Sequence, residues 1–127
     1  MEDGEQRRDE RGAVDIGVIR ETSLGDTHFE RELIRIFLAD NDERVARIGA
    51  AIRTGDAARV WSDAHALKGA SGTIGATRLT LLARQLEVMG ARGELSGGAA
   101  RYKDLVGEYA RVRDALEEHV RSLSEPS

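Results

Sequence analysis

Cysteine is absent from the 127-residue sequence, which excludes disulfides and thiolate metal sites and is compatible with a reducing compartment. The one proline stands at position 126, so the interior of the chain is free to form long helices. No apolar run approaches the ~20 residues that a membrane span needs. The residues after Met1 are charged and include no apolar core, so we expect no secretory signal. These absences predict a soluble, cytoplasmic protein with no membrane partner.

A strong excess of one charge is also lacking. The net charge is −4, and the 33% of residues that are charged carry both signs. This balance argues against a nucleic-acid partner. The sequence has no nucleotide-binding loop of the Walker or kinase type, and no Glu-x-x-His or His-x-x-x-His pair. We therefore expect neither ATP binding nor a metal site.

Apolar residues recur at threes and fours along most of the chain, without an alternating strand pattern or hairpin signals. Asp15 is expected to cap a short helix, Asp26 or Thr27 to begin a long one, and Asp56 to cap the next. The short helix is expected to stop near 24–25 and the long one to end near 53, and the helix that contains His65 follows Asp56. A third long helix should follow 74–75, carry apolar residues from 79 to 89 and fray over 90–93, and the last should cover about 99–123. This pattern predicts an all-α fold, an antiparallel up-down four-helix bundle with a short additional N-terminal helix. Residues 13–123 would form the bundle, 1–12 a disordered N-terminal tail and 124–127 a C-terminal tail.

Core positions follow from the same periodicity. The 27–53 helix is expected to bury one stripe of apolar side chains: Phe29, Leu33, Ile36, Phe37, Val45, Ile48 and Ile52. Ile34 and Leu38 form a second ridge beside that stripe, either in contact with the short first helix or partly open. Trp61 and the two tyrosines are expected in the core.

The stretch 63–76 contains one histidine, His65, on the flank of the apolar stripe of its helix. At about 100° per residue, only small residues share its side of the helix. These are Ala58, Ser62, Gly69, Gly72 and Ala76. A glycine inside a helix costs about 1 kcal/mol relative to alanine, and Gly69 has no role as a helix terminator, unlike Gly72 and Gly75. An imidazole on so clear a face suits the close approach of another macromolecule.

A lone histidine is most often structural or merely exposed. We expect His28, at a helix start, to be exposed, and His119, on the seam of the last helix, to be a satisfied structural residue. Without its neighbours, His65 would be read in the same way.

The run His65-x-Leu67-Lys68-Gly69, followed by Gly72, Ile74-Gly75-Ala76, Leu79 and Leu86-Glu87, closely resembles the histidine phosphotransfer (HPt) domain of bacterial and fungal phosphorelays. The resemblance extends from about Val14 to Val120. It implies that His65 is phosphorylated, that Lys68 lies near the phosphoryl group, and that Gly69 makes room for the partner. It also implies that Glu87 contacts the imidazole.

Chemistry makes these roles reasonable. Imidazole, with a usual pKa near ~6.5, offers a neutral nucleophilic nitrogen at cellular pH, provided that its other nitrogen carries the proton. Glu87 is the candidate acceptor for that Nδ1–H, with a solvated surface carboxylate as the alternative. Lys68 would offset phosphoryl charge, or would simply be a surface lysine.

The resemblance also implies the partners: receiver domains of response regulators, with a hybrid histidine kinase as a further candidate. The receiver would supply Mg²⁺, so the chain itself needs no cofactor. Ile34 and Leu38 are candidates for apolar contact area around the small-residue row of Ala58, Ser62, Gly69 and Gly72. We expect a monomeric phosphoryl carrier without kinase activity of its own.

A second hypothesis comes from a different class. The chain could be a phosphorylation-independent helical bundle that keeps the scaffold and sequesters a signalling partner. The intact set of His65, Lys68 and Gly69 favours the carrier, because a pure scaffold has no use for a glycine at position 69.

Overall fold

The computed structural model describes residues 12–124. Most of the two predicted tails, residues 1–11 and 125–127, lies outside the described residues. Within the described range the chain forms five helices and no strand. They are α2 (Ile16–Thr22), α3 (Thr27–Thr54), α4 (Ala57–Thr73), α5 (Thr77–Arg92) and α6 (Gly98–Ser124).

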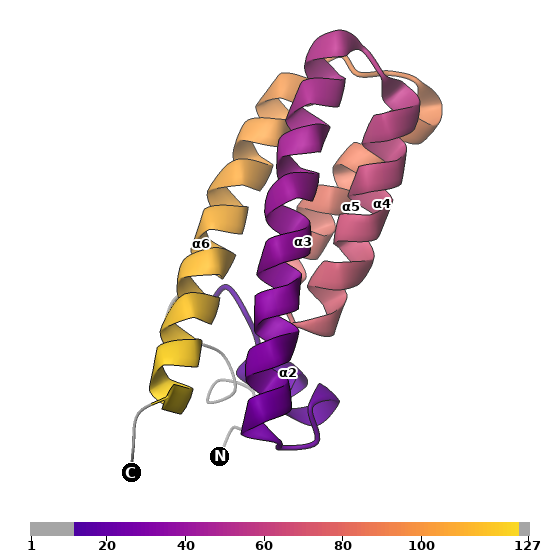
Figure 1. Cartoon of the computed structure of the whole chain (residues 1–127). Helices are drawn as coiled ribbons and strands as arrows, with labels where there is room; N and C mark the ends of the chain where they lie inside the picture. The colour runs from indigo at the N-terminus through magenta and orange to yellow at the C-terminus, as the bar shows by residue number, and fades with distance from the viewer. Residues whose placement is uncertain (1–11, 125–127) are drawn as a thin grey trace.

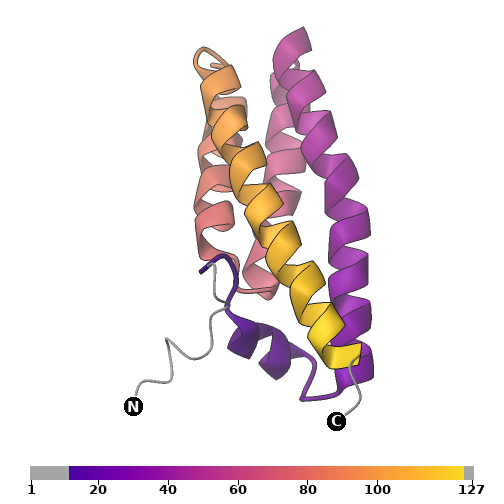
Figure 2. The same ribbon diagram turned by 90° about the vertical axis from the view of Figure 1, so that its left-hand side faces the viewer.

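The four long helices lie side by side and run alternately up and down (Figure 1). Each packs against its neighbours in the order α3, α4, α5, α6 and back to α3, and the α4–α5 pairing is the most extensive. The short α2 lies across one end of the bundle, in contact with α3 and α4 (Figure 2). The predicted fold class is confirmed.

Aspartate caps set the beginnings of three helices. The side chain of Asp15 accepts a hydrogen bond from the backbone N of Gly17 at 3.0 Å, that of Asp26 from Phe29 at 3.1 Å, and that of Asp56 from Arg59 at 3.1 Å. Each cap satisfies a backbone N–H that the first helical turn leaves without a partner. The caps at Asp15 and Asp56 were predicted from the sequence, and of the two starts left open for the long helix, Asp26 and Thr27, Asp26 is the cap.

The core lies between the four long helices. Its fully buried large apolar side chains come from every element: Val14, Ile19, Ile34, Ile48, Val60, Leu67, Ile74, Leu79, Leu86, Leu105 and Leu116. Close packing of such side chains is the main favourable contribution to the stability of a bundle of this size.

The predicted stripe of α3 is partly wrong. Phe29 and Ile36 are 47% and 50% exposed, whereas Ile34, assigned to the second ridge, is 1% exposed. The buried face of α3 instead passes through two polar residues, Glu30 and Asn41. A stripe drawn through apolar residues alone is therefore rotated away from the true one.

Glu30 is buried because three elements meet around its carboxylate. One oxygen is bonded to Nε2 of His119 from α6. The other accepts a 3.5 Å hydrogen bond from Oγ of Ser23 and lies 3.9 Å from Nε of Arg20. A buried charge is stable only when paired in this way. His119 is thus the satisfied structural histidine that was predicted, and His28 is exposed as expected.

A second polar contact joins α3 and α6. The hydroxyl of Tyr109 donates to Oδ1 of Asp42 at 2.6 Å, and Nη1 of Arg113 lies 2.5 Å from the same oxygen. Burial and the adjacent carboxylate raise the pKa of Tyr109. Tyr109 is buried and Tyr102 half-buried, so the expected core position of the tyrosines is correct for Tyr109 and only partly so for Tyr102.

Candidate functional site

His65 lies near the middle of α4 and points away from the core. Its side chain is 56% exposed. The residues that anchor α4 lie on the opposite face, where Val60, Ala64 and Leu67 are fully buried. The imidazole is thus held on a rigid, packed helix while remaining open to solvent.

Helices α4 and α5 approach each other closely beside the histidine. A Cβ added at Gly90 of α5 would lie 2.6 Å from the backbone N of Trp61 and 2.8 Å from the carbonyl O of Ala57, which is closer than atoms can pack. Gly90 was predicted to begin a frayed end, but it is a buried residue within α5. The missing side chain allows this approach, and Glu87 lies one turn earlier on α5.

Glu87 is hydrogen-bonded to both His65 and Lys68. Its Oε2 lies 2.7 Å from Nδ1 of His65, and its Oε1 lies 2.8 Å from Nζ of Lys68. The Glu87 side chain is 13% exposed, so this carboxylate is largely shielded while the two groups that bond it reach solvent. The contact between Glu87 and the imidazole, predicted from the resemblance, is present. The catalytic roles of these residues stay predictions.

The charge of Glu87 is stabilised by its neighbours. The hydrogen bond from Lys68, followed by that from His65, lowers the pKa of the Glu87 carboxyl against the opposing effect of burial. An ionised Glu87 accepts a hydrogen bond from Nδ1–H of His65 and so favours the tautomer in which Nε2 carries the free lone pair. No described residue is hydrogen-bonded to Nε2.

Four members of the small-residue row surround His65 as expected. Ala58, Ser62, Gly69 and Gly72 are exposed, and a Cβ added at Gly69 or Gly72 would meet no atom within 4 Å. Open space above these positions leaves the imidazole as the tallest group along that row of α4. Ala76, by contrast, follows the end of α4 and is buried.

The apolar contact area assigned to α3 is wrong for one of its two residues. Ile34 is 1% exposed and belongs to the core, so it offers no surface to a partner. Leu38 is partly buried and packs against the core, leaving only part of its side chain accessible. Ile34 shares the inner face of α3 with the buried polar residues Glu30 and Asn41, which a stripe drawn through apolar residues alone leaves out.

Two features of this region were not predicted from the sequence. Trp61, expected in the core, is 42% exposed and its ring stacks on that of His65, with centroids 5.2 Å apart and planes inclined by 9°. The spacing of four residues along a helix was the available signal. Beneath the site, Arg47 of α3 donates two hydrogen bonds to Asp63 at 3.0 and 3.3 Å. Nothing local in the sequence indicated that pair.

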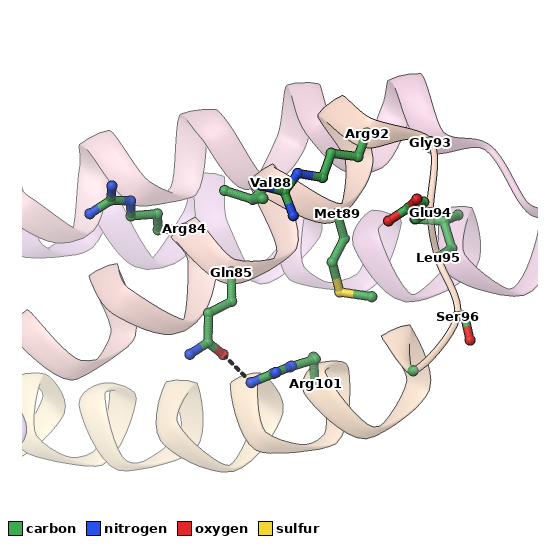
Figure 3. A pocket seen from close by; sticks show the side chains of 11 residues that line it. Arg84, Gln85, Val88, Met89, Arg92, Gly93, Glu94, Leu95, Ser96 and Arg101 are labelled. Atoms are coloured by element: carbon green, nitrogen blue, oxygen red, sulfur yellow. Dashed lines mark hydrogen bonds between the residues drawn. The ribbon is translucent and has the colours of Figure 1, made fainter.

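Two surface hollows lie on α5. One, of about 910 Å³, is bounded by the second half of α5 and the start of α6, and Figure 3 shows Gln85 and Arg101 bonded across it. It contains none of the predicted site residues. The other, of about 550 Å³, is lined by Ala58 and Trp61 together with residues 90–93, and so borders the site.

Among residues 12–124 there is no group of three or more His, Cys, Asp or Glu side chains placed to hold a metal ion. Over the same residues, no helix is both long enough and apolar enough to cross a membrane.

Comparison with known proteins agrees with this geometry. The model of the Hpt domain family matches residues 32–122. The fold is similar to that of histidine-containing phosphotransfer protein B from Pseudomonas aeruginosa PAO1, with 28% identity, a TM-score of 0.81, and coverage of 87% of this chain and 96% of that one.

It is also similar to the HPT domain of an Hpt sensor hybrid histidine kinase from Shewanella. The TM-score is 0.78 at 20% identity, over 91% of this chain and 100% of that one. No curated protein matches the chain in sequence. Because the family model spans most of the bundle, the chain belongs to the Hpt domain family, whose members serve phosphotransfer in phosphorelays.

Proposed function

We propose that the chain is a phosphoryl carrier that accepts a phosphoryl group on Nε2 of His65 from the aspartate of a receiver domain, and returns it to the aspartate of another. In the first step the Nε2 lone pair forms the N–P bond, the acyl-phosphate P–O bond breaks, and the receiver's carboxylate leaves. The reverse sequence delivers the group onward. The observation that carries this proposal is the exposed imidazole whose Nδ1 lies 2.7 Å from Glu87.

Electrostatics support the same assignment. A phosphoryl group adds about −1.5 to −2 charge in its ester analogues. Lys68, one turn after His65, is half-buried and already bonded to Glu87 at 2.8 Å, so it places a cation within the cluster. Its three donors allow it to keep the carboxylate as one partner while facing the phosphoryl group.

Docking is the remaining requirement. Phosphoryl transfer between two proteins depends mainly on positioning and on charge stabilisation, and the receiver's aspartate has to reach Nε2. The exposed row of Ala58, Ser62, Gly69 and Gly72 permits that approach. The Mg²⁺ that phosphoryl transfer uses would come with the receiver.

A hybrid histidine kinase is a further candidate source of the phosphoryl group. The cytoplasmic location and the monomeric state of the chain stay predictions.

The second candidate function is a phosphorylation-independent bundle that sequesters a partner. The same exposed face would serve binding alone. The close contact of Glu87 with Nδ1 favours the carrier, because a binding face does not require a fixed tautomer of histidine.

Transfer from a phosphorylated receiver tests the proposal. The wild-type chain should become labelled, His65→Gln should not, and His28→Gln should behave as the wild type because His28 is a matched exposed histidine outside the site. Label on His65→Gln would refute the assignment.

Incubation with labelled ATP and Mg²⁺ should leave the chain unlabelled. An acid-labile signal in that experiment would show that the chain has kinase activity of its own.

A further inference from the structure

Trp61 is the aromatic side chain that covers one face of the His65 ring. The two residues are one helical turn apart on α4, and their rings are nearly parallel, with centroids 5.2 Å apart and an angle of 9° between the planes. Stacked pairs prefer an offset arrangement with centroids ~4.5–7 Å apart, and this pair lies in that range. The contact therefore has the geometry of a favourable stack.

The helix that carries the indole is closely packed at Trp61. The backbone of α4 at Trp61 is pressed against α5, since even a Cβ at Gly90 would come within 2.6 Å of its backbone N. The hollow beside the indole is lined by Ala58 and residues 90–93, which are mostly small. Trp61 is 42% exposed, so a large apolar side chain occupies a surface position where a polar residue would be more usual.

One hydrogen bond does not fix the orientation of an imidazole. Glu87 holds the Nδ1 edge of His65, yet the ring could still turn about the line that joins Nδ1 to Oε2. A flat surface against one face of the ring removes this freedom. The carboxylate and the indole together determine both the tautomer and the plane of the ring, and they leave the Nε2 edge open.

We propose that Trp61 is a positioning residue, which holds the plane of the His65 imidazole so that Nε2 is aimed at an incoming phosphoryl group. This inference rests on the function proposed above and adds a residue to it. In-line attack requires the Nε2 lone pair to point at phosphorus, and small errors in orientation slow such reactions. Loss of the stack should slow phosphorylation by about three- to tenfold, the range expected of one aromatic pair.

The test compares two phosphate donors of different size. Phosphoramidate reacts directly with an imidazole: the Nε2 lone pair forms the N–P bond, the P–N bond of the donor breaks, and ammonia leaves with a proton from water. It needs no docking surface. A phosphorylated receiver needs both docking and ring orientation. A positioning residue affects both donors, whereas a residue that only contacts the receiver affects one.

The variants are Trp61→Leu, which keeps apolar bulk without a ring, and Trp61→Phe, which restores an aromatic face. Val106→Ala is the control, because Val106 is equally exposed at 42% but lies on α6. We expect Trp61→Leu to be slowed with both donors, Trp61→Phe to recover most of the rate, and Val106→Ala to match the wild type. Unchanged rates in Trp61→Leu, or a loss confined to the receiver, would overturn the inference.

Nuclear magnetic resonance of the His65 ring protons gives a readout independent of transfer. A ring stacked on an indole has its proton resonances shifted upfield, and this shift should be present in the wild type and lost in Trp61→Leu. Its absence from the wild type would overturn the inference even if Trp61→Leu were poorly folded. Failure of the wild type to accept phosphate from any donor would instead refute the proposed function, so the two failures are distinguishable.

Discussion

At the scale of single residues, Glu87 is the group on which the site depends. It bonds Nδ1 of His65 at 2.7 Å and Nζ of Lys68 at 2.8 Å while being 13% exposed. A largely shielded carboxylate that serves two donors favours a fixed geometry over a mobile surface contact. The resemblance of the run around His65 anticipated this contact, but it said nothing about Trp61.

The pKa of Glu87 gives a pH-dependent prediction. Because this pKa is lowered from its ordinary value of 4.5, Glu87 contributes stability that is fully present above pH 4.5 and is lost as the pH falls through its folded-state pKa. Glu87→Gln removes that contribution. The difference in Tm between the wild type and Glu87→Gln should therefore shrink as the pH is lowered from 6 to about 3. Thermal melts followed by circular dichroism measure it, and a constant difference would contradict the account.

At the scale of helices, two glycines differ in the space that is available for a side chain. Gly90 permits the contact between α4 and α5, whereas Gly69 has open space above it. Gly107, in the interior of α6, also has no atom within 4 Å of an added Cβ. Substitutions at Gly107 are therefore the control for the same substitutions at Gly90 and Gly69.

Gly90→Ala should destabilise the bundle although alanine is the better helix former. The added Cβ would clash with the backbone of Trp61, and α5 would have to move away and carry Glu87 with it. Gly107→Ala should gain up to about 1 kcal/mol from helix propensity alone. Thermal melts of the two variants should thus shift in opposite directions, and Gly90→Ala should also accept phosphate more slowly. Equal stabilisation of both variants would show that the contact is not tight.

Gly69→Gln tests docking. The glutamine should be accommodated and raise or leave unchanged the Tm, because it enters open space and improves helix propensity. It should nevertheless obstruct the receiver and reduce transfer by at least tenfold, while Gly107→Gln leaves transfer unchanged. Transfer rates from a phosphorylated receiver measure this. A well-folded Gly69→Gln that accepts phosphate at the wild-type rate would favour the sequestering bundle.

The helix starts were predictable because each depends on a local signal. Asp15 and Asp56 cap helices as predicted, and Asp26 is one of the two starts predicted for α3. The buried face of α3 was not predictable, because the burial of Glu30 depends on partners distant in sequence, above all His119 on α6. Hydrophobic patterns do not reveal a buried carboxylate whose partner lies 89 residues away.

At the scale of the whole molecule, polar contacts between helices, each with a buried carboxylate, help to hold the bundle together. Glu30 with His119 joins α3 to α6, and Arg47 with Asp63 joins α3 to α4 beneath the site. Neither pair includes His65, Lys68 or Glu87. Substitution of the structural His119 should therefore lower stability, whereas substitution of the exposed His65 should abolish phosphate acceptance.

His119→Ala should destabilise the chain by about 3 kcal/mol, because it leaves the Glu30 carboxylate buried without its main partner. His28→Ala, on the exposed start of α3, should change the free energy of unfolding by less than about 0.5 kcal/mol. Urea denaturation measures both. At temperatures where His119→Ala remains folded, it should still accept phosphate, and loss of labelling in that folded state would contradict the assignment to His65.

The central claim is that the phosphoryl group resides on Nε2 of His65 while Nδ1 keeps its proton toward Glu87. Nuclear magnetic resonance of the phosphorylated chain with ¹⁵N-labelled histidine tests it most directly, because coupling to ³¹P identifies the nitrogen that carries the group. We predict that the coupled nitrogen is Nε2 of one histidine and that the signal is absent from His65→Gln. Coupling at Nδ1, or at either of the other two histidines, would contradict it.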